Sequence, residues 1–246
     1  MHGFTGTPFE VRSLAEAFGR EGFSVEAPTL AGHGDSLAAL TPSTWRDWLA
    51  SAETALDALS ARVGGGPVAL VGFSMGALLS LRLARMYPER VAAVVAMGTP
   101  LRLHRWKSAV IRAVTALPLP LARMPGVRVP KTNGSDISIP EMRYGNPGLP
   151  ALPVAALGQL IRLMDTVREE DLAAVRAPAL LVHGRHDHVV PAADAEELAV
   201  RLGSPVIERL WLERSFHIVG LDVDAAQLTR AATSFVSRFL VPSRRP

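Results

Sequence analysis

The sequence contains no cysteine, which excludes disulfides, a thiolate nucleophile and any cysteine-ligated metal site. Its net charge is only +3, from 26 Lys+Arg against 23 Asp+Glu, so the charge of the whole chain does not favour nucleic acid as a partner. No apolar run approaches the roughly 18 to 20 residues that cross a bilayer, and no signal-peptide pattern opens the chain. These absences predict a soluble, cytoplasmic protein.

The chain has 246 residues, of which 48% are hydrophobic and 20% are charged, as expected for one packed domain. Short β-rich runs alternate with amphipathic stretches of helical length, which predicts a mostly parallel sheet with helices on both faces. We expect strands at 23–28, 68–71, 91–96, 179–182 and 206–211, and helices at about 9–20, 44–62, 75–87, 192–202 and 223–239.

The stretch from about residue 100 to 155 breaks this rhythm. It is rich in proline and glycine and contains no convincing strand. We interpret residues 100–155 as a small cap inserted over a core formed by residues 1–99 and 156–246.

A nucleophile motif stands between an apolar strand and a helical run. Gly72-Phe73-Ser74-Met75-Gly76 has the G-x-S-x-G pattern, in which a tight strand-to-helix turn exposes the serine hydroxyl above a helix N-terminus. Glycines suit both ends because a side chain would crowd so sharp a turn. The alternative is an ordinary Gly/Ser turn, but its position between strand and helix favours Ser74 as a nucleophile.

A serine hydroxyl needs a base and an orienting carboxylate, which follow in the order acid, then histidine, in this kind of fold. Asp187 and His217 each lie in a loop just after a predicted strand, where sites in open parallel sheets assemble. We therefore predict Ser74, Asp187 and His217 as the catalytic residues. The alternatives are a loop-capping carboxylate and a half-buried loop histidine.

The other histidines are weaker candidates. His183, His186 and His188 lie close together, but no partner at a recognised spacing completes a metal shell, so we predict no metal site. His33 and His104 are interpreted as turn and surface residues.

The negative charge that forms on an attacked carbonyl oxygen needs two backbone donors. One is expected from the amide of Met75, the residue after the nucleophile. The other is expected from the glycine-containing loop at residues 2–8, at Phe4. The alternative for that loop is a flexible N-terminal turn.

Several motifs together resemble the bacterial monoacylglycerol lipase and carboxylesterase family of the α/β-hydrolase superfamily. They are His2-Gly3-Phe4-Thr5-Gly6, Gly32-His33-Gly34, the Ser74 pentapeptide, Arg185-His186-Asp187-His188-Val189-Val190 and Ser215-Phe216-His217. The resemblance implies hydrolysis of short- to medium-chain carboxylic esters and monoacylglycerols through an acyl-enzyme on Ser74, without a cofactor. It also implies that Phe4 and Met75 supply the oxyanion amides.

Within the cap, Gly134-Ser135-Asp136-Ile137 and the following Glu141-Met142-Arg143-Tyr144 resemble the cap of monoacylglycerol lipases. The resemblance implies that Glu141 binds the alcohol side of the substrate. An exposed glutamate at a helix start is the alternative.

The resemblance also leads us to expect a segment ahead of the His-Gly loop, including a central strand that leads into it. We expect the N-terminal strands to be missing from the chain as written, either through a late start or through truncation. A version extended upstream would then be more stable and more active.

A basic amphipathic helix is predicted around Trp106, Val110 and Leu117, with Arg105, Lys107 and Arg112 on other faces. Such a helix beside an ester site is suited to transient contact with a lipid surface. The alternative, which we favour, is that its apolar face covers the acyl pocket or the core.

Three rival functions keep the same three residues: thioesterase, acyltransferase and lactone hydrolase. The triad activates an acyl group without specifying its leaving group. A catalytically silent α/β-hydrolase fold that binds a small molecule is the rival from another class. The sequence specifies neither the physiological ester nor the oligomeric state.

Overall fold

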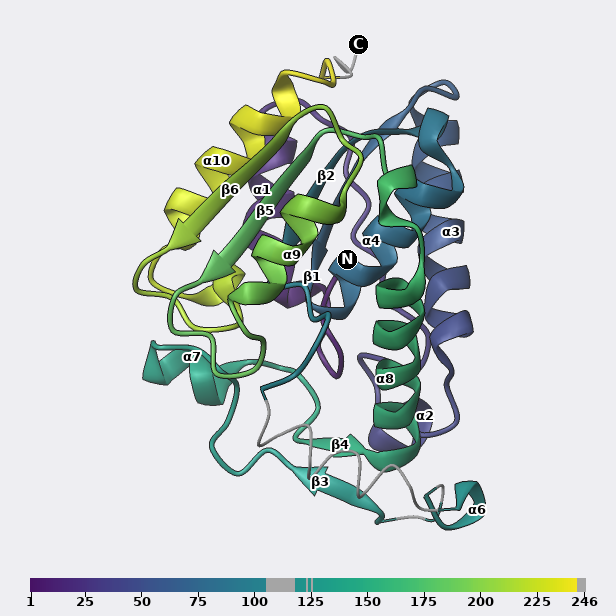
Figure 1. The fold of residues 1–246 in the computed structure, drawn as a ribbon. Coiled ribbons are helices and arrows are strands. Elements are labelled where there is room, and N and C mark those ends of the chain that lie inside the picture. The colour runs from purple at the N-terminus through teal and green to yellow at the C-terminus, as the bar shows by residue number, and fades with distance from the viewer. Residues whose placement is uncertain (105–117, 123, 125, 243–246) are drawn as a thin grey trace.

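The structure, a computed structural model, describes residues 1–104, 118–122, 124 and 126–242. Within these residues the central sheet has four parallel strands in the order β1-β2-β5-β6 (Figure 1). They are β1 (Val68–Phe73), β2 (Val91–Met97), β5 (Ala179–Gly184) and β6 (Ile207–Leu212). All four strands were predicted from the sequence.

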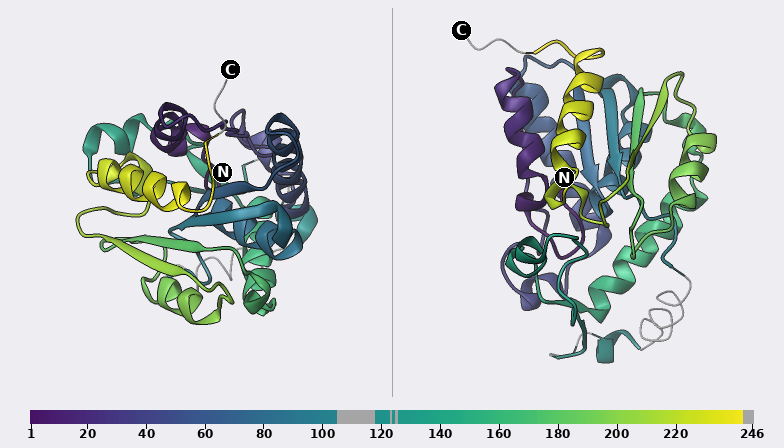
Figure 2. Two further views of the ribbon diagram at one scale, coloured as in Figure 1. Left: turned by 90° about the horizontal axis from the view of Figure 1, so that it is seen from above. Right: turned by 90° about the vertical axis from the view of Figure 1, so that its left-hand side faces the viewer.

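Helices cover both faces of the sheet (Figures 1 and 2). One face carries α3 (Trp45–Arg62), α4 (Met75–Met86), α8 (Val154–Glu169) and α9 (Ala193–Arg201). The opposite face carries α1 (Arg12–Arg20) and α10 (Ala225–Ser237). The short elements are η1 (Pro8–Val11), α2 (Leu37–Leu40), η2 (Pro88–Arg90), α6 (Leu119–Ala122), α7 (Pro140–Gly145), η3 (Leu172–Ala174) and η4 (Val219–Leu221).

The strands hold two apolar clusters apart because successive side chains point to opposite faces. Val94 of β2 and Leu181 of β5 belong to the cluster under α3, α4 and α8. Their neighbours Val95 and Leu180 belong to the cluster under α1 and α10. The sheet is therefore buried on both sides. Side chains that a substrate could reach must lie in the loops at the strand ends.

The described part of the stretch predicted to lack strands contains two short strands. β3 (Arg128–Pro130) and β4 (Ala151–Pro153) pair antiparallel, at the end of the molecule toward which the central strands point (Figure 1). Each is only three residues long and contains a proline, which cannot donate to the ladder, so the local pattern concealed both strands. Helix α8 was also not predicted, although Leu160, Leu163 and Val167 share its buried face.

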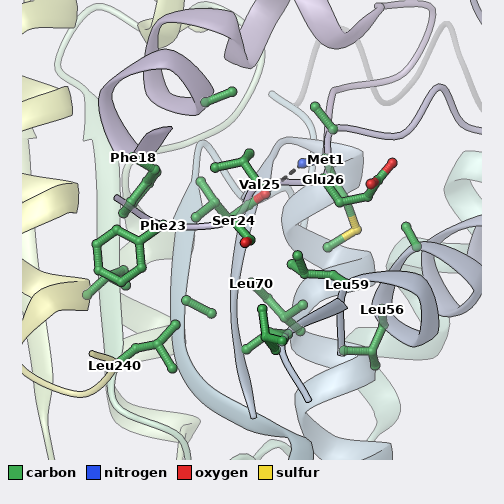
Figure 3. A pocket seen from close by; sticks show the side chains of 18 of the residues that line it. Met1, Phe18, Phe23, Ser24, Val25, Glu26, Leu56, Leu59, Leu70 and Leu240 are labelled. Atoms are coloured by element: carbon green, nitrogen blue, oxygen red, sulfur yellow. Dashed lines mark hydrogen bonds between the residues drawn. The ribbon is translucent and has the colours of Figure 1, made fainter. Parts of the chain in front are cut away.

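The strand predicted at Phe23–Pro28 was wrong, because the structure assigns no strand there. A strand needs a hydrogen-bonded neighbour, and an apolar groove of about 430 Å³ lies between this segment, α3 and β1 instead. Figure 3 shows Phe23 and Val25 facing Leu59 and Leu70 across the groove. Pattern alone cannot tell a paired strand from an extended segment without a partner.

Met1 lies at one end of this groove. Its ammonium donates to the carbonyl of Val71 at 2.7 Å, and the amide of Phe73 donates to the carbonyl of Met1 at 3.0 Å. This is the bonding pattern of a parallel strand pair. Residue 1 therefore enters alongside β1, which is the outermost strand of the central sheet within the described ranges.

The basic amphipathic helix predicted over residues 105–117 lies outside the described residues. None of the helices in the described ranges combines the length and hydrophobicity that crossing a bilayer requires. Arg102, which precedes these residues, is described, and it forms ion pairs with Asp194 and Glu197.

Candidate active site

Ser74 occupies the turn between β1 and α4 with a backbone φ of 53°, a conformation uncommon for a residue with a side chain. Its amide donates to the carbonyl of Met97 at 2.8 Å, which ties the turn to the end of β2. A Cβ on Gly72 would clash with the backbone of Gly76. This crowding explains why the turn requires glycine, as the sequence predicted.

His217 brings the three predicted residues into one hydrogen-bonded line. Its Nε2 lies 3.1 Å from the hydroxyl oxygen of Ser74, and its Nδ1 lies 2.7 Å from a carboxylate oxygen of Asp187. The loops that follow β5 and β6 carry Asp187 and His217 to the same end of the sheet as the Ser74 turn. The ring of Phe73 packs against the imidazole, with centroids 4.9 Å apart.

Backbone amides fix the carboxylate of Asp187. Its Oδ1 accepts hydrogen bonds from the amides of Val189 and Val190, both at 2.8 Å, which leaves Oδ2 to face His217. Burial works to raise the pKa of Asp187, but the neighbouring His217 and His183 and these amides hold it below its ordinary value. The group therefore stays an anion at neutral pH.

The same pair acts in the opposite direction on the imidazole. Burial works to lower the pKa of His217, but the charge and hydrogen bond of Asp187 outweigh it and raise the pKa above its ordinary value. The raised pKa makes His217 a stronger base toward the Ser74 hydroxyl.

His183, considered above as a metal candidate, instead contacts the carboxylate of the line. Its Nε2 lies 3.3 Å from Oδ2 of Asp187 and 3.2 Å from the carbonyl of Val190. Within the described ranges, no cluster of three or more His, Asp or Glu side chains could hold a metal ion.

The loop that begins at His2 passes close to the N-terminus of α4. A Cβ on Gly76 would clash with the backbone carbonyl of Met1 and approach that of His2 to 2.7 Å, so only glycine permits this contact. Among the described residues, the amides of Phe4 and Met75 have no acceptor. Two free donors thus lie on the two segments that meet beside Ser74.

The buried carboxylate of Glu10 is hydrogen-bonded to this loop. The sequence did not predict this contact. Oε2 of Glu10 accepts a hydrogen bond from the amide of Gly3 at 2.9 Å, and a Cβ on Gly6 would clash with the carboxyl group. Burial raises the pKa of Glu10, against the opposing effects of the Gly3 amide and Lys131.

Glu141, the predicted alcohol-side residue, lies exposed in the first turn of α7. It makes no hydrogen bond or ion pair with another described residue, and the structure does not bring it into contact with Ser74 or His217. Its role stays a prediction.

Two further residues near the line were missed. Gly98, at the end of β2 with φ of 54°, leaves space for the imidazole, because a Cβ there would lie 3.2 Å from Cε1 of His217. Asp136 accepts a hydrogen bond from the amide of His217 at 3.2 Å. A glycine directly after a strand could have suggested Gly98, but no local signal indicates where Asp136 lies.

The parallel sheet, its two helical layers and the strand-turn-helix at Ser74 define an α/β-hydrolase fold. The chain belongs to the family described as serine aminopeptidase, S33, whose model matches residues 1–224.

Curated relatives within this fold are ester hydrolases by name. The thermostable monoacylglycerol lipase of Bacillus sp. (strain H-257) is 31% identical over 242 residues, covering 97% of this chain and 89% of that protein. The carboxylesterase of Bacillus subtilis (strain 168) is 24% identical over 222 residues, covering 90% and 84%.

A solved structure supports the fold over almost the full length. It comes from work on LipS and LipT, two metagenome-derived lipolytic enzymes, and matches with a TM-score of 0.86 and 34% identity, covering 96% of this chain and 91% of that chain. The predicted family resemblance and fold class are confirmed.

Proposed function

We propose that this protein is a carboxylic ester hydrolase that acts through an acyl-enzyme on Ser74. One observation carries the proposal: the hydroxyl of Ser74, the imidazole of His217 and the carboxylate of Asp187 form an unbroken hydrogen-bonded line at 3.1 and 2.7 Å. The names of the curated relatives, monoacylglycerol lipase and carboxylesterase, support the same class of reaction.

In the first half-reaction the Ser74 oxygen attacks the ester carbonyl while Nε2 of His217 takes the hydroxyl proton. The carbonyl oxygen becomes an oxyanion, which we assign to the free amides of Phe4 and Met75. The intermediate then collapses, the C–O bond to the alcohol breaks, and His217 returns the proton to the departing alkoxide oxygen. The product is an acyl-Ser74 ester and a free alcohol.

In the second half-reaction water takes the place of the alcohol. His217 removes one water proton as the oxygen attacks the acyl carbon, and then protonates the Ser74 oxygen as it leaves. Asp187 keeps its charge throughout and stabilises the imidazolium that forms twice in each cycle.

We propose monoacylglycerols and short- to medium-chain esters as substrates, with residues 100–155 as the cap and Glu141 on the alcohol side. The name of the Bacillus sp. (strain H-257) relative supports the monoacylglycerol assignment. Transient contact of the cap with a lipid surface stays a proposal on the sequence pattern of residues 105–117.

A fluorophosphonate probe tests the mechanism. We expect labelling of Ser74 that is abolished in Ser74→Ala and strongly suppressed in His217→Ala, since the probe needs the activated oxygen. Equal labelling of the wild type and Ser74→Ala would contradict the proposal.

Turnover of a substrate panel tests the class. We expect activity on p-nitrophenyl esters and on monoacylglycerols, with chain-length preference read from kcat/KM. An aminoacyl p-nitroanilide should be included, because the family description names an aminopeptidase. Faster cleavage of the anilide than of every ester would overturn the ester assignment.

A further inference from the structure

The segment from Lys131 to Leu149 contacts the loops that surround Ser74. The amide of Leu149 donates to the carbonyl of Thr5 at 2.8 Å, in the loop that carries Phe4. The amide of Ile218, one residue after His217, donates to the carbonyl of Asp136 at 3.1 Å. This segment is therefore built into the site.

The side chain of Asp136 makes the densest of these contacts. Its Oδ2 accepts hydrogen bonds from the amides of His188 and His217, at 3.0 and 3.2 Å, and its Oδ1 lies 2.8 Å from Nδ1 of His188. His188 follows Asp187 directly. One carboxylate thus joins the loop that carries Asp187 to the loop that carries His217, across 52 and 81 positions of sequence.

This bridge holds a part of His217 that Asp187 does not. Asp187 fixes the imidazole through Nδ1, whereas Asp136 fixes the backbone from which the ring projects. A hydrogen bond from a neutral amide to a carboxylate is stronger than one to a neutral acceptor. Together the two carboxylates determine the direction of Nε2, which lies 3.1 Å from the Ser74 hydroxyl oxygen.

We propose that Asp136 is a positioning residue for the reaction of Ser74, because its carboxylate locks the loops of Asp187 and His217 in register. The effect of Asp136 on turnover rests on the proposed function. The hydrogen bonds by which Asp136 holds the two loops together can be measured without any turnover.

The charge of Asp136 also faces the imidazole. Among the described residues, the charged and titratable groups near His217 and its loop come from several elements. They are Asp187, His183 and His188 from β5 and its following loop, Asp136 from the segment 131–149, Asp222 beside the Phe216 amide, and Glu10 from η1. Burial works to lower the pKa of His217, and Asp187, Asp136 and Glu10 raise it. Removing the Asp136 charge should therefore move the pKa of His217 downward.

Asp222, the residue after η4, supplies a matched control because it bonds to the same segment. Its carboxylate accepts hydrogen bonds from the amides of Ser138 and Phe216, at 3.0 and 2.8 Å, and also bonds the hydroxyl of Ser138. It thus joins the same two stretches of chain one residue away from His217, without touching that residue. A general loosening of the segment would follow from either substitution, whereas an effect on His217 should follow from only one.

The experiment compares Asp136→Asn, Asp136→Ala and Asp222→Asn in the full chain. In Asp136→Asn the amide oxygen can still accept both backbone bonds while the charge is lost. We expect kcat to be largely kept and the acid limb of the kcat/KM profile to move to lower pH. In Asp136→Ala the charge and both backbone hydrogen bonds are lost, and kcat should fall on the order of tenfold to a hundredfold with KM little changed. Asp222→Asn should leave the acid limb in place.

An NMR titration of the His217 imidazole provides the readout that does not need turnover. The pKa should fall in Asp136→Asn, which loses the charge, and stay unchanged in Asp222→Asn. Hydrogen exchange of the His188 and His217 amides should be faster in Asp136→Ala, which also loses their acceptor, than in the wild type and Asp136→Asn. If the wild type cleaves no ester but both differences appear, the proposed function fails while the positioning role stands. If these two amides exchange alike in the wild type and Asp136→Ala, or if Asp222→Asn shifts the His217 pKa as much as Asp136→Asn does, the positioning role is overturned even in an active enzyme.

Discussion

Two regions at the β1 side of the sheet differ sharply in how their groups are satisfied. Beyond the C-terminal end of β1, the imidazole of His217 is hydrogen-bonded on one side to Ser74 and on the other to Asp187. Along the outer edge of β1, Leu59, Leu70 and other apolar side chains line a groove, and within the described ranges no further strand pairs with that edge (Figure 3).

The two regions depend on different interactions, hydrogen bonds at the site and apolar packing at the groove. At the site, short directional hydrogen bonds fix the geometry. Replacing a single oxygen atom by nitrogen there can therefore cost much activity, although the volume of the side chain hardly changes. At the groove, contacts are apolar and one-sided, so a lost methyl group forfeits little packing. Three measurements test this contrast, in order of expected effect.

The largest effect is expected from Asp187→Asn. The amides of Val189 and Val190 require an oxygen at the Oδ1 position, so the new NH₂ group must face Nδ1 of His217. The ring proton then moves to Nε2, which can no longer accept the proton of Ser74. We expect kcat to fall about a thousandfold or more, with an almost unchanged melting temperature. Steady-state kinetics with a p-nitrophenyl ester measures this.

Leu59→Ala in the groove is the control for that loss. It should leave kcat within about twofold, because one-sided apolar contacts at the groove do not position the groups around Ser74. A similar loss of turnover in both variants would remove the contrast between the two regions.

A smaller effect separates packing at the two places. Leu163 of α8 is completely buried, whereas Leu59 is half-buried beside the groove. Leu163→Ala should lower the free energy of unfolding by about 2 to 5 kcal/mol, and Leu59→Ala by less than about 1 kcal/mol. Urea denaturation of the two variants gives both values, and equal losses would show that the groove is packed as tightly as the core.

The third effect concerns pH and is small only when it is taken per pH unit. Burial lowers the pKa of His2 to about 3 and of His33 to about 4, below the ordinary 6.5. Both rings bind protons in the unfolded chain before they do in the fold, so each should add up to about 1.4 kcal/mol of destabilisation per pH unit below 6.5. The raised pKa values of Glu10 and His217 act in the opposite sense.

His33→Asn isolates one contribution, because its amide nitrogen can replace Nδ1 in the bond to the Ala31 carbonyl at 3.0 Å. The free energy of unfolding of this variant should fall less steeply between pH 6.5 and 4 than that of the wild type. In Leu59→Ala the slope should be unchanged, and parallel curves for His33→Asn and the wild type would refute the assignment.

The fold was predictable where burial alone determines the pattern of an element. β2 and β5 have continuous apolar runs because both their faces are buried, and α3 shows its buried positions Trp48, Ala52 and Leu56 at helical spacing. The extended segment at Phe23–Pro28 has the same kind of pattern but no partner beside it. Strand formation depends on that partner, which a local window does not contain.

The hydrogen-bonded line was predictable because its chemistry demands three residue types and this fold places them in a fixed order after strand ends. Ser74, Asp187 and His217 could be placed in this way, and the structure brings them together. Asp136 could not, because it acts through backbone amides that are remote in sequence and leave no residue-type signature. The tertiary path of the segment 131–149 had to be known first.

The outer edge of β1 also bears on the behaviour of the protein in bulk solution. Met1 bonds the outward peptide groups of Val71 and Phe73, and within the described ranges no strand pairs with the rest of that border. An open stretch of border can add a strand from another molecule, and an apolar trough beside it favours that association. Among the described residues that line the trough, Glu26 has the one charged side chain, and it forms an ion pair with Arg62. Self-association through this border would make melting temperatures depend on protein concentration, so thermal comparisons between variants belong at one fixed, low concentration.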